Sequence, residues 1–185
     1  MPEKEYDMGA CTVFFKSAGA TSETELGYTS GGCTVKVSTE TKEIEVDQLL
    51  EPVDEIITKR SITVSIPLAS FTLENLQRAF PGSKIITDAT VSTKKKLVIS
   101  SISGRSAMSD VGELRLHPVT AASETDKSKD FLFLAAAPLT TSLEIQYTKD
   151  GLKTIPIEFK AYSSQATATK DITLIIGDPT ATASE

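Results

Sequence analysis

The sequence predicts a mainly β fold, an antiparallel β-barrel or sandwich with one flanking α-helix. Hydrophobic residues take every second position in residues 33–38 and again in 61–66, the pattern of strands with one covered and one wet face. Thr, Ser, Val and Ile are abundant in the strand-like segments, which favours β structure over a helical bundle. The 185 residues are enough for one domain with a sizeable core.

One short helix is expected at residues 72–80. Thr72 or Ser70 can cap its first turn, and Glu74 suits the positive end of the helix dipole. The expected apolar stripe consists of Leu73, Leu76, Ala79 and Phe80. The side chains expected to face water are Glu74, Asn75, Gln77 and Arg78. Pro81-Gly82 ends the helix, which should plug the end or flank of a sheet.

Between the two alternating segments, residues 38–55 form a polar and acidic excursion that should project from the body. Its carboxylates are Glu40, Glu43, Glu45, Asp47, Glu51, Asp54 and Glu55. The first four could bind calcium, but the segment lacks the spaced Asp or Asn ligands and the turn glycine of a known calcium loop. A solvated or partner-facing surface is therefore favoured.

Further strands are expected along the chain. They are residues 11–15, 84–91, 96–102, 112–119, 131–137 and 172–176, and a hairpin over 143–159. In 112–119, Leu114 and Leu116 share one face, Arg115 and His117 share the opposite, wet face, and Pro118 ends the strand or marks an edge.

Several loops and turns separate these strands. The connecting loops are residues 17–24, 104–110 and 123–130. The near-continuous apolar run at 131–137 should be buried on both faces, and Asp150-Gly151 suits the hairpin turn. A Ser/Thr/Ala linker at 163–169 precedes the last strand, and 178–185 resembles a flexible arm. The last strand could instead pair with a neighbouring subunit.

The residues predict no catalytic, cofactor or metal site. His117 is the only histidine, with no second His and no Ser or Cys elbow around it. Gly31-Gly32 is interpreted as a turn, because no helix start or Lys-Ser/Thr follows it. Cys11 and Cys33 match no zinc spacing, and in a reducing cytoplasm two buried thiols are favoured over a disulfide. The absence of Trp gives no aromatic wall for a glycosidase cleft or a carbohydrate platform.

The net charge of −6 argues against binding a nucleic-acid backbone, because there is no surplus of Lys and Arg to replace counterions. The only basic run, Lys94-Lys95-Lys96, is interpreted as a solvated turn before a strand rather than a phosphate site. Residues 1–13 show no signal-peptide pattern, and the apolar run 131–139 is too short to cross a bilayer. We therefore expect synthesis in a cytoplasm and no membrane contact.

The order of these features resembles the major tail tube proteins of long-tailed, siphophage-type bacteriophages. The resemblance lies in GYTSGG before a strand, EIEVDQ and PVDEI in the acidic excursion, TLENL and PG around the helix, and the later IPIEFKAY segment. It covers residues 27–162, which places a tail-tube domain at 1–162 and a C-terminal strand and arm at 163–185.

The resemblance implies the fold shared by tail tube and type VI secretion tube subunits, and a structural protein rather than an enzyme. Six subunits would form a ring, and rings would stack into a hollow tube through which DNA passes without specific binding. A net-negative subunit suits such a conduit, since its wall would repel phosphates. The implied partners are copies of this chain and the tape measure, terminator and distal tail proteins, in a virion tail assembled in the host cytoplasm.

The acidic excursion would correspond to the loop that reaches a neighbouring ring. Pro52 and Val53 would supply apolar contact there, and the carboxylates would pair with Lys59 or Arg60. The residues expected at this inter-ring contact are Glu40, Glu43, Glu45, Asp47, Glu51, Pro52, Val53, Asp54, Lys59 and Arg60.

Two alternatives to a tail tube subunit remain. One is an immunoglobulin-like or adhesin-like binding module, which the internal helix and the long excursion disfavour. The other is a different ring protein of the tail, such as a terminator or hub component, and the sequence does not separate this from a tube subunit.

Overall fold

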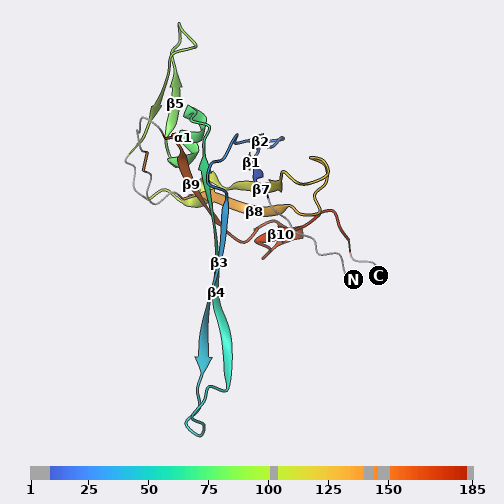
Figure 1. Cartoon of the computed structure of the whole chain (residues 1–185). Helices are drawn as coiled ribbons and strands as arrows, with labels where there is room; N and C mark the ends of the chain where they lie inside the picture. The colour runs from blue at the N-terminus through green and yellow to red at the C-terminus, as the bar shows by residue number, and fades with distance from the viewer. Residues whose placement is uncertain (1–8, 101–103, 140–143, 146–150, 183–185) are drawn as a thin grey trace.

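A computed structural model of the chain describes residues 9–100, 104–139, 144–145 and 151–182. These residues form an eight-stranded antiparallel sheet, a separate two-stranded sheet and one α-helix (Figure 1). The predicted mainly β, antiparallel fold with one flanking helix is therefore confirmed. The strands are β1 (Cys11–Ser17), β2 (Thr24–Glu25), β3 (Thr34–Ile44), β4 (Asp54–Leu68), β5 (Lys84–Thr87), β6 (Lys95–Val98), β7 (Gly112–Pro118), β8 (Phe131–Pro138), β9 (Ile155–Ala161) and β10 (Leu174–Ile176). The helix is α1 (Leu73–Ala79), and 3-10 turns lie at η1 (Ala107–Asp110) and η2 (Thr167–Thr169).

The large sheet folds back on itself through β8. Its strand order is β2-β1-β7-β8-β9-β4-β3, with β10 also paired to β8. The register pairs β8 with β7 from Phe131 to Ala136 and with β9 from Ala136 to Pro138, so β8 belongs to both halves of the sheet. The β7–β8 half crosses the β4–β9 half in Figure 1, as in a sandwich whose corner is made by a shared strand.

The core lies between the two halves and follows the predicted alternation. Its large side chains include Val13 and Phe15 of β1, Ile62, Val64, Ile66 and Leu68 of β4, Leu114 and Leu116 of β7, Phe133 of β8, and Ile155, Ile157 and Phe159 of β9. The rings of Phe15 and Phe159 lie 5.3 Å apart between centroids and join the halves. At Gly112, a Cβ would lie 2.3 Å from the Lys16 carbonyl oxygen, so only glycine allows β1 and β7 to approach this closely.

The helix α1 begins at the predicted cap and buries one unexpected residue. Thr72 Oγ1 accepts a hydrogen bond from the Asn75 amide at 3.2 Å. The expectation that Asn75 faces water is wrong, because its side-chain amide donates to the carbonyls of Leu26 (2.9 Å) and Ser70 (3.0 Å). These partners lie outside the helix, so helical periodicity does not reveal them. Asn75 thus ties α1 to the chain segment that follows β2.

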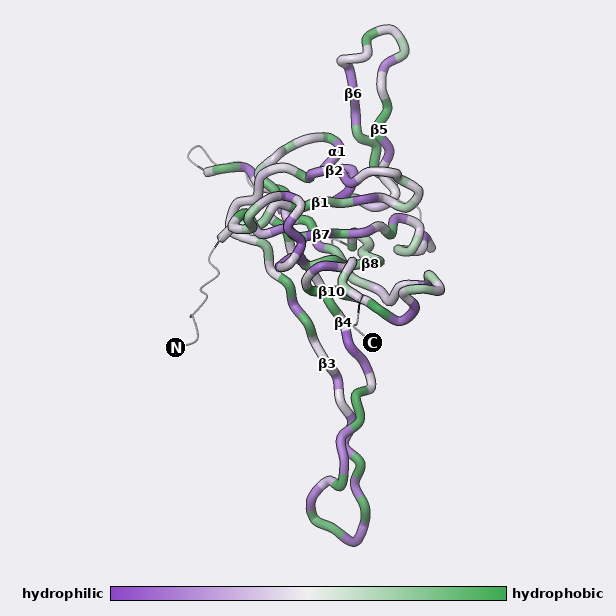
Figure 2. The backbone as a smooth tube through the Cα atoms, turned by 90° about the vertical axis from the view of Figure 1, so that its right-hand side faces the viewer, coloured by the Kyte–Doolittle hydropathy of each residue, from purple (hydrophilic) through white to green (hydrophobic). Residues whose placement is uncertain are grey.

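Two hairpins project from this body in opposite directions (Figures 1 and 2). The longer one is formed by β3 and β4, and its pairing runs out to Ile44 and Asp54. The excursion expected at 38–55 is therefore mostly strand, and only residues 45–53 connect the two strands. The shorter hairpin is formed by β5 and β6, which pair only with each other.

Other boundaries differ from the expected ones. The expected strands at 84–91 and 96–102 are shorter, because β5 ends at Thr87 and β6 at Val98, and residues 101–103 are not described. The apolar run expected to be buried on both faces over 131–137 alternates at first, with Phe133 buried and Leu132 and Leu134 half-buried, and consecutive residues are buried only over 135–138. The last strand begins at Leu174 and pairs with β8 of its own chain, so this structure does not leave it to a neighbour.

The hairpin expected over 143–159 is described only in part. Its second strand is β9, whereas most of its first strand and the turn residues 149–150 lie outside the described residues, as do residues 183–185 of the expected C-terminal arm. No helix in the described part of the chain has the length and apolar character needed to span a membrane.

Candidate functional site

The β3–β4 hairpin beyond the body, residues 40–60, is here called the arm. Its strands pair antiparallel, and the Val53 amide closes the end of the ladder with a 2.8 Å hydrogen bond to the Ile44 carbonyl. A β-bulge interrupts the register between Glu40 and Thr41, and Thr58 is the extra residue on β4. The Thr58 hydroxyl donates to the Glu40 carbonyl at 3.1 Å. The arm is therefore an ordered two-stranded hairpin rather than a loop.

All ten residues predicted at the inter-ring contact lie on the arm and are exposed. Two of them already contact each other, because Lys59 Nζ lies 2.8 Å from Glu40 Oε1. The Thr41 hydroxyl also donates to the carboxylate of Glu55 across the strands. An exposed ion pair contributes at most about 1 kcal/mol, so Lys59 and Glu40 can exchange partners at little cost. Arg60 has no ion-pair partner among the described residues.

The tip of the arm, residues 43–55, carries the whole net charge of the protein. It holds six of the 25 acidic residues and no Lys or Arg, which leaves 19 acidic and 19 basic residues in the rest of the chain. Glu43 and Glu55 stand directly opposite each other in the ladder. Like charges in opposed positions destabilise a β-hairpin. A positively charged partner at the tip would relieve this repulsion.

Large apolar side chains are exposed between these carboxylates. Leu49 is 61% exposed and Leu50 is 106% exposed, relative to a reference peptide. Val53 in the tip, and Ile56 and Ile57 just beyond it, are each more than half exposed. Hydrophobic residues therefore alternate with hydrophilic ones around the end of the arm (Figure 2). Exposed apolar side chains on a projecting element are typical of interaction sites. The sequence predicted apolar contact only for Pro52 and Val53. The adjacent apolar pairs Leu49-Leu50 and Ile56-Ile57, which interrupt the acidic run, also indicate an apolar contact surface.

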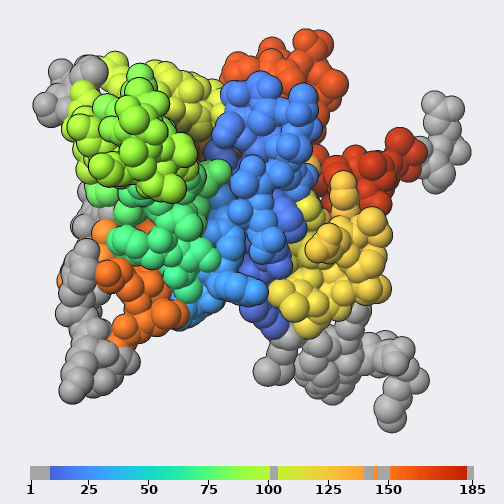
Figure 3. Space-filling view, turned by 90° about the horizontal axis from the view of Figure 1, so that it is seen from above, coloured from blue at the N-terminus to red at the C-terminus, as the bar shows by residue number. Residues whose placement is uncertain are grey.

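The β5–β6 hairpin at the opposite end has the opposite charge. Residues 84–98 contain four lysines, Lys84, Lys94, Lys95 and Lys96, and one carboxylate, Asp88. Asp88 Oδ1 accepts hydrogen bonds from the amides of Thr90 (2.9 Å) and Val91 (2.8 Å), which fix the tip and lower the pKa of that carboxyl group. In Figure 3, a view from above, the yellow-green hairpin forms a raised lobe.

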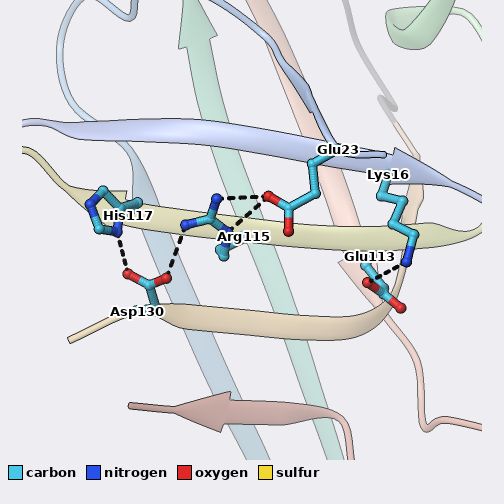
Figure 4. A network of polar contacts seen from close by, with 6 residues as sticks. All are labelled: Lys16, Glu23, Glu113, Arg115, His117 and Asp130. Carbon is cyan, nitrogen blue, oxygen red and sulfur yellow. Dashed lines mark hydrogen bonds and ion pairs between the residues drawn. The ribbon is translucent and has the colours of Figure 1, made fainter. Parts of the chain in front are cut away.

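A buried polar network joins β7, the start of β8 and the β1–β2 loop (Figure 4). Asp130 is 1% exposed, and its two oxygens contact His117 Nδ1 (2.6 Å) and Arg115 Nη1 (3.1 Å). Arg115 also donates to Glu23 at 2.7 and 2.9 Å and lies 4.1 Å from the centre of the Phe14 ring. Burial alone would lower the pKa of Arg115, but the hydrogen bonds to Glu23 and Asp130 raise it overall.

The placement of His117 on a wet face is therefore wrong. Asp130 follows a charged loop and lies 13 residues along the chain, so strand periodicity gave no sign that it would cover this face. Asp130, Arg115 and Glu23 were not predicted to act together. Buried charges need such partners, which makes the network a structural tie between strands.

Cys11 and Cys33 lie together beside an apolar groove. Both are free and half-buried, and the groove is also lined by Val35, Leu116 and Leu174. A hydrogen bond from the Cys33 thiol lowers the pKa of Cys11 although burial opposes this, and the same bond together with burial raises the pKa of Cys33. We therefore expect the two thiols to differ in reactivity.

Neither a metal site nor a known relative identifies the protein. Within the described ranges, no three His, Cys, Asp or Glu side chains gather closely enough to hold a metal ion, and this includes the acidic tip. A scan against protein-family models found no matching family, and a search of curated proteins found no matching relative. The arm and the β5–β6 hairpin therefore remain the candidate functional surfaces of the described residues.

Proposed function

We propose that this chain is the structural subunit of a bacteriophage tail tube. Hexameric rings of the subunit would stack into the conduit for DNA ejection. The observation that supports this most directly is the arm, an ordered hairpin that extends away from the body and contributes no large side chain to the core. An element with exposed apolar side chains and a concentrated charge is suited to assembly rather than to folding.

Open sheet edges favour the formation of a ring. β3 is the last strand of its sheet, and within the described residues no strand covers its outer edge. At the other end of the sheet, the two-residue strand β2 pairs only with Phe14 and Phe15 of β1. Unpaired strand edges readily accept another chain. A contact between two different edges is heterologous, and such contacts close into rings when the rotation is suitable.

The outward face of the β3–β4–β9 half gives this ring a suitable wall. Residues of β4 that point away from the core include Ser61, Thr63 and Ser65. Their neighbours in the ladder are also polar and are Thr34, Lys36 and Ser38 of β3 and Glu158 and Lys160 of β9. Because the acidic surplus lies on the arm, the wall in this proposal is rich in hydroxyl groups rather than strongly acidic. Outside the tip of the arm, acidic and basic residues are equal in number, so the chain has no overall basic surplus to release counterions from DNA.

Electron microscopy of negatively stained protein over a concentration series, with light scattering for mass, tests this function. Rings or hollow tubes with a central channel are the expected result. A protein that stays monomeric at every concentration contradicts the proposal and favours a binding module.

A shortened arm tests the role of residues 45–53 separately. Replacing them with an Asn-Gly turn keeps the Ile44–Asp54 pair and supplies the positive φ angles that a tight hairpin needs. We expect this variant to form rings that do not stack. Tubes of normal length from this variant would contradict a role of the arm between rings.

A further inference from the structure

We propose that the arm of one copy docks on the β5–β6 hairpin of another copy, so that the two projecting ends of the subunit are partners. This inference rests on the proposed tube function and names the surface that receives the arm. The occupant is a second copy of this chain, because each end supplies what the other lacks.

Both projecting hairpins expose apolar side chains. Leu49, Leu50 and Val53 are exposed at the tip of the arm. On the receiving hairpin, Ile86 and Val98 are each 42% exposed. Neither set has a place in the core of its own chain. Removing both sets from water would favour association.

The two hairpins carry charges of opposite sign. The tip of the arm carries six negative charges and no positive one, whereas the β5–β6 hairpin carries four lysines and one carboxylate. Lys95 already lies 3.7 Å from Glu74 of α1, but Lys94 and Lys96 have no ion-pair partner within the described residues. Complementary charges speed encounter and exclude wrong partners. Two arms would repel each other, so the charges favour contact between unlike ends and disfavour contact between like ends.

The directions of the two hairpins suit a repeating contact between copies. The arm and the β5–β6 hairpin project in opposite directions from the body (Figures 1 and 2). A contact between two different surfaces of the same protein leaves one of each free after every addition, so it propagates. Because the ends differ in charge sign, every copy added this way has the same orientation. The subunit therefore specifies the polarity of the stack.

Two charge-reversed proteins and their mixture test the inference. The receiver variant is Lys94→Glu with Lys96→Glu, which leaves that hairpin with three acidic and two basic residues. The arm variant is Glu43→Lys, Glu45→Lys, Asp47→Lys and Glu51→Lys, which leaves the tip with two acidic and four basic residues. A control, Lys127→Glu with Lys170→Glu, changes the net charge as much as the receiver variant, at two residues that belong to neither hairpin. Stacking is measured by electron microscopy and light scattering, and sedimentation velocity reports association in solution.

We expect each reversed variant alone to need at least about tenfold more protein to stack than the wild type or the control. An equimolar mixture should restore stacking, because each variant then meets a complementary surface on the other. A misfolded variant would not be rescued by mixing. A receiver variant that stacks like the wild type, or a mixture that stacks no better than its components, overturns the inference.

The wild-type protein separates this inference from the proposed function. If it forms neither rings nor tubes, the tube function fails. Sedimentation velocity then still decides the docking, because the mixture must associate more strongly than either variant alone.

Discussion

Removal of the Asp130 carboxylate should strongly destabilise the fold. Its oxygens accept two charge-assisted bonds, from Arg115 at 3.1 Å and from His117 at 2.6 Å, in a site that is 1% exposed. Each such bond contributes about 1.5–3 kcal/mol, and breaking a buried pair typically costs about 3–5 kcal/mol. Glu23 still holds Arg115 in an Asp130→Ala variant, so we expect a loss of about 3–5 kcal/mol in the free energy of unfolding.

Urea unfolding followed by circular dichroism measures this loss, at a protein concentration too low for assembly. With a slope of about 2 kcal/mol per M, the midpoint should fall by about 1.5–2.5 M and the slope should not change. Glu23→Ala is the matched control, because Glu23 lies at the exposed side of the network and Arg115 keeps Asp130. We expect that variant to lose no more than about 1 kcal/mol. Equal losses for the two variants, or a loss below about 1 kcal/mol for Asp130→Ala, would refute the reasoning.

Three further predictions concern assembly, thiol chemistry and the helix cap. Changing Leu49 and Leu50 together to Ser should leave the unfolding free energy within about 0.5 kcal/mol. The same change should raise the concentration needed for tube formation, measured by light scattering, about tenfold or more, and an unchanged threshold would contradict apolar docking. At pH 8, iodoacetamide should modify Cys11 before Cys33. The lowered pKa of Cys11 gives it a larger thiolate fraction at any pH, and the raised pKa of Cys33 gives it a smaller one. Peptide mass spectrometry measures the order of modification, and the reverse order would disprove this prediction. Thr72→Ala should cost about 1 kcal/mol in urea unfolding, because it removes the cap of α1, whereas Thr72→Ser should cost little; equal midpoints for these two variants would refute the cap.

Local patterns were sufficient to predict the helix and most of the strands of the body, but not β2 or the outer parts of β3 and β4. Alternation identified the core face of β4 through Ile62, Val64 and Ile66, because a covered strand must place apolar side chains at every second position. The cap at Thr72 could also be predicted from local sequence, because the amide that it accepts from lies only three residues away, at Asn75. Asn75 was placed on the wrong face because its partners lie far along the chain.

The projecting arm was predicted in location but not in form. The acidic run marked residues 40–55 as exposed, which the structure shows. The run also suggested a loop, because a strand held by cross-strand pairing alone has no apolar alternation. The counterpart at Lys94–Lys96 was interpreted as a solvated turn, since no local pattern reveals that two hairpins point in opposite directions.

The bulge at Thr58 affects the direction in which the arm projects but not the residues at its tip. Bulges bend a hairpin and increase its twist, so this single residue helps set the angle at which the arm leaves the body. The ladder pairs on either side, Glu40 with Lys59 and Thr41 with Ile57, would suit an uninterrupted register if Thr58 were absent. In the proposed stack, an insertion or deletion here would alter the pitch and rise while leaving the acidic, apolar tip unchanged. Changes at this one position would therefore give stacks of different helical symmetry.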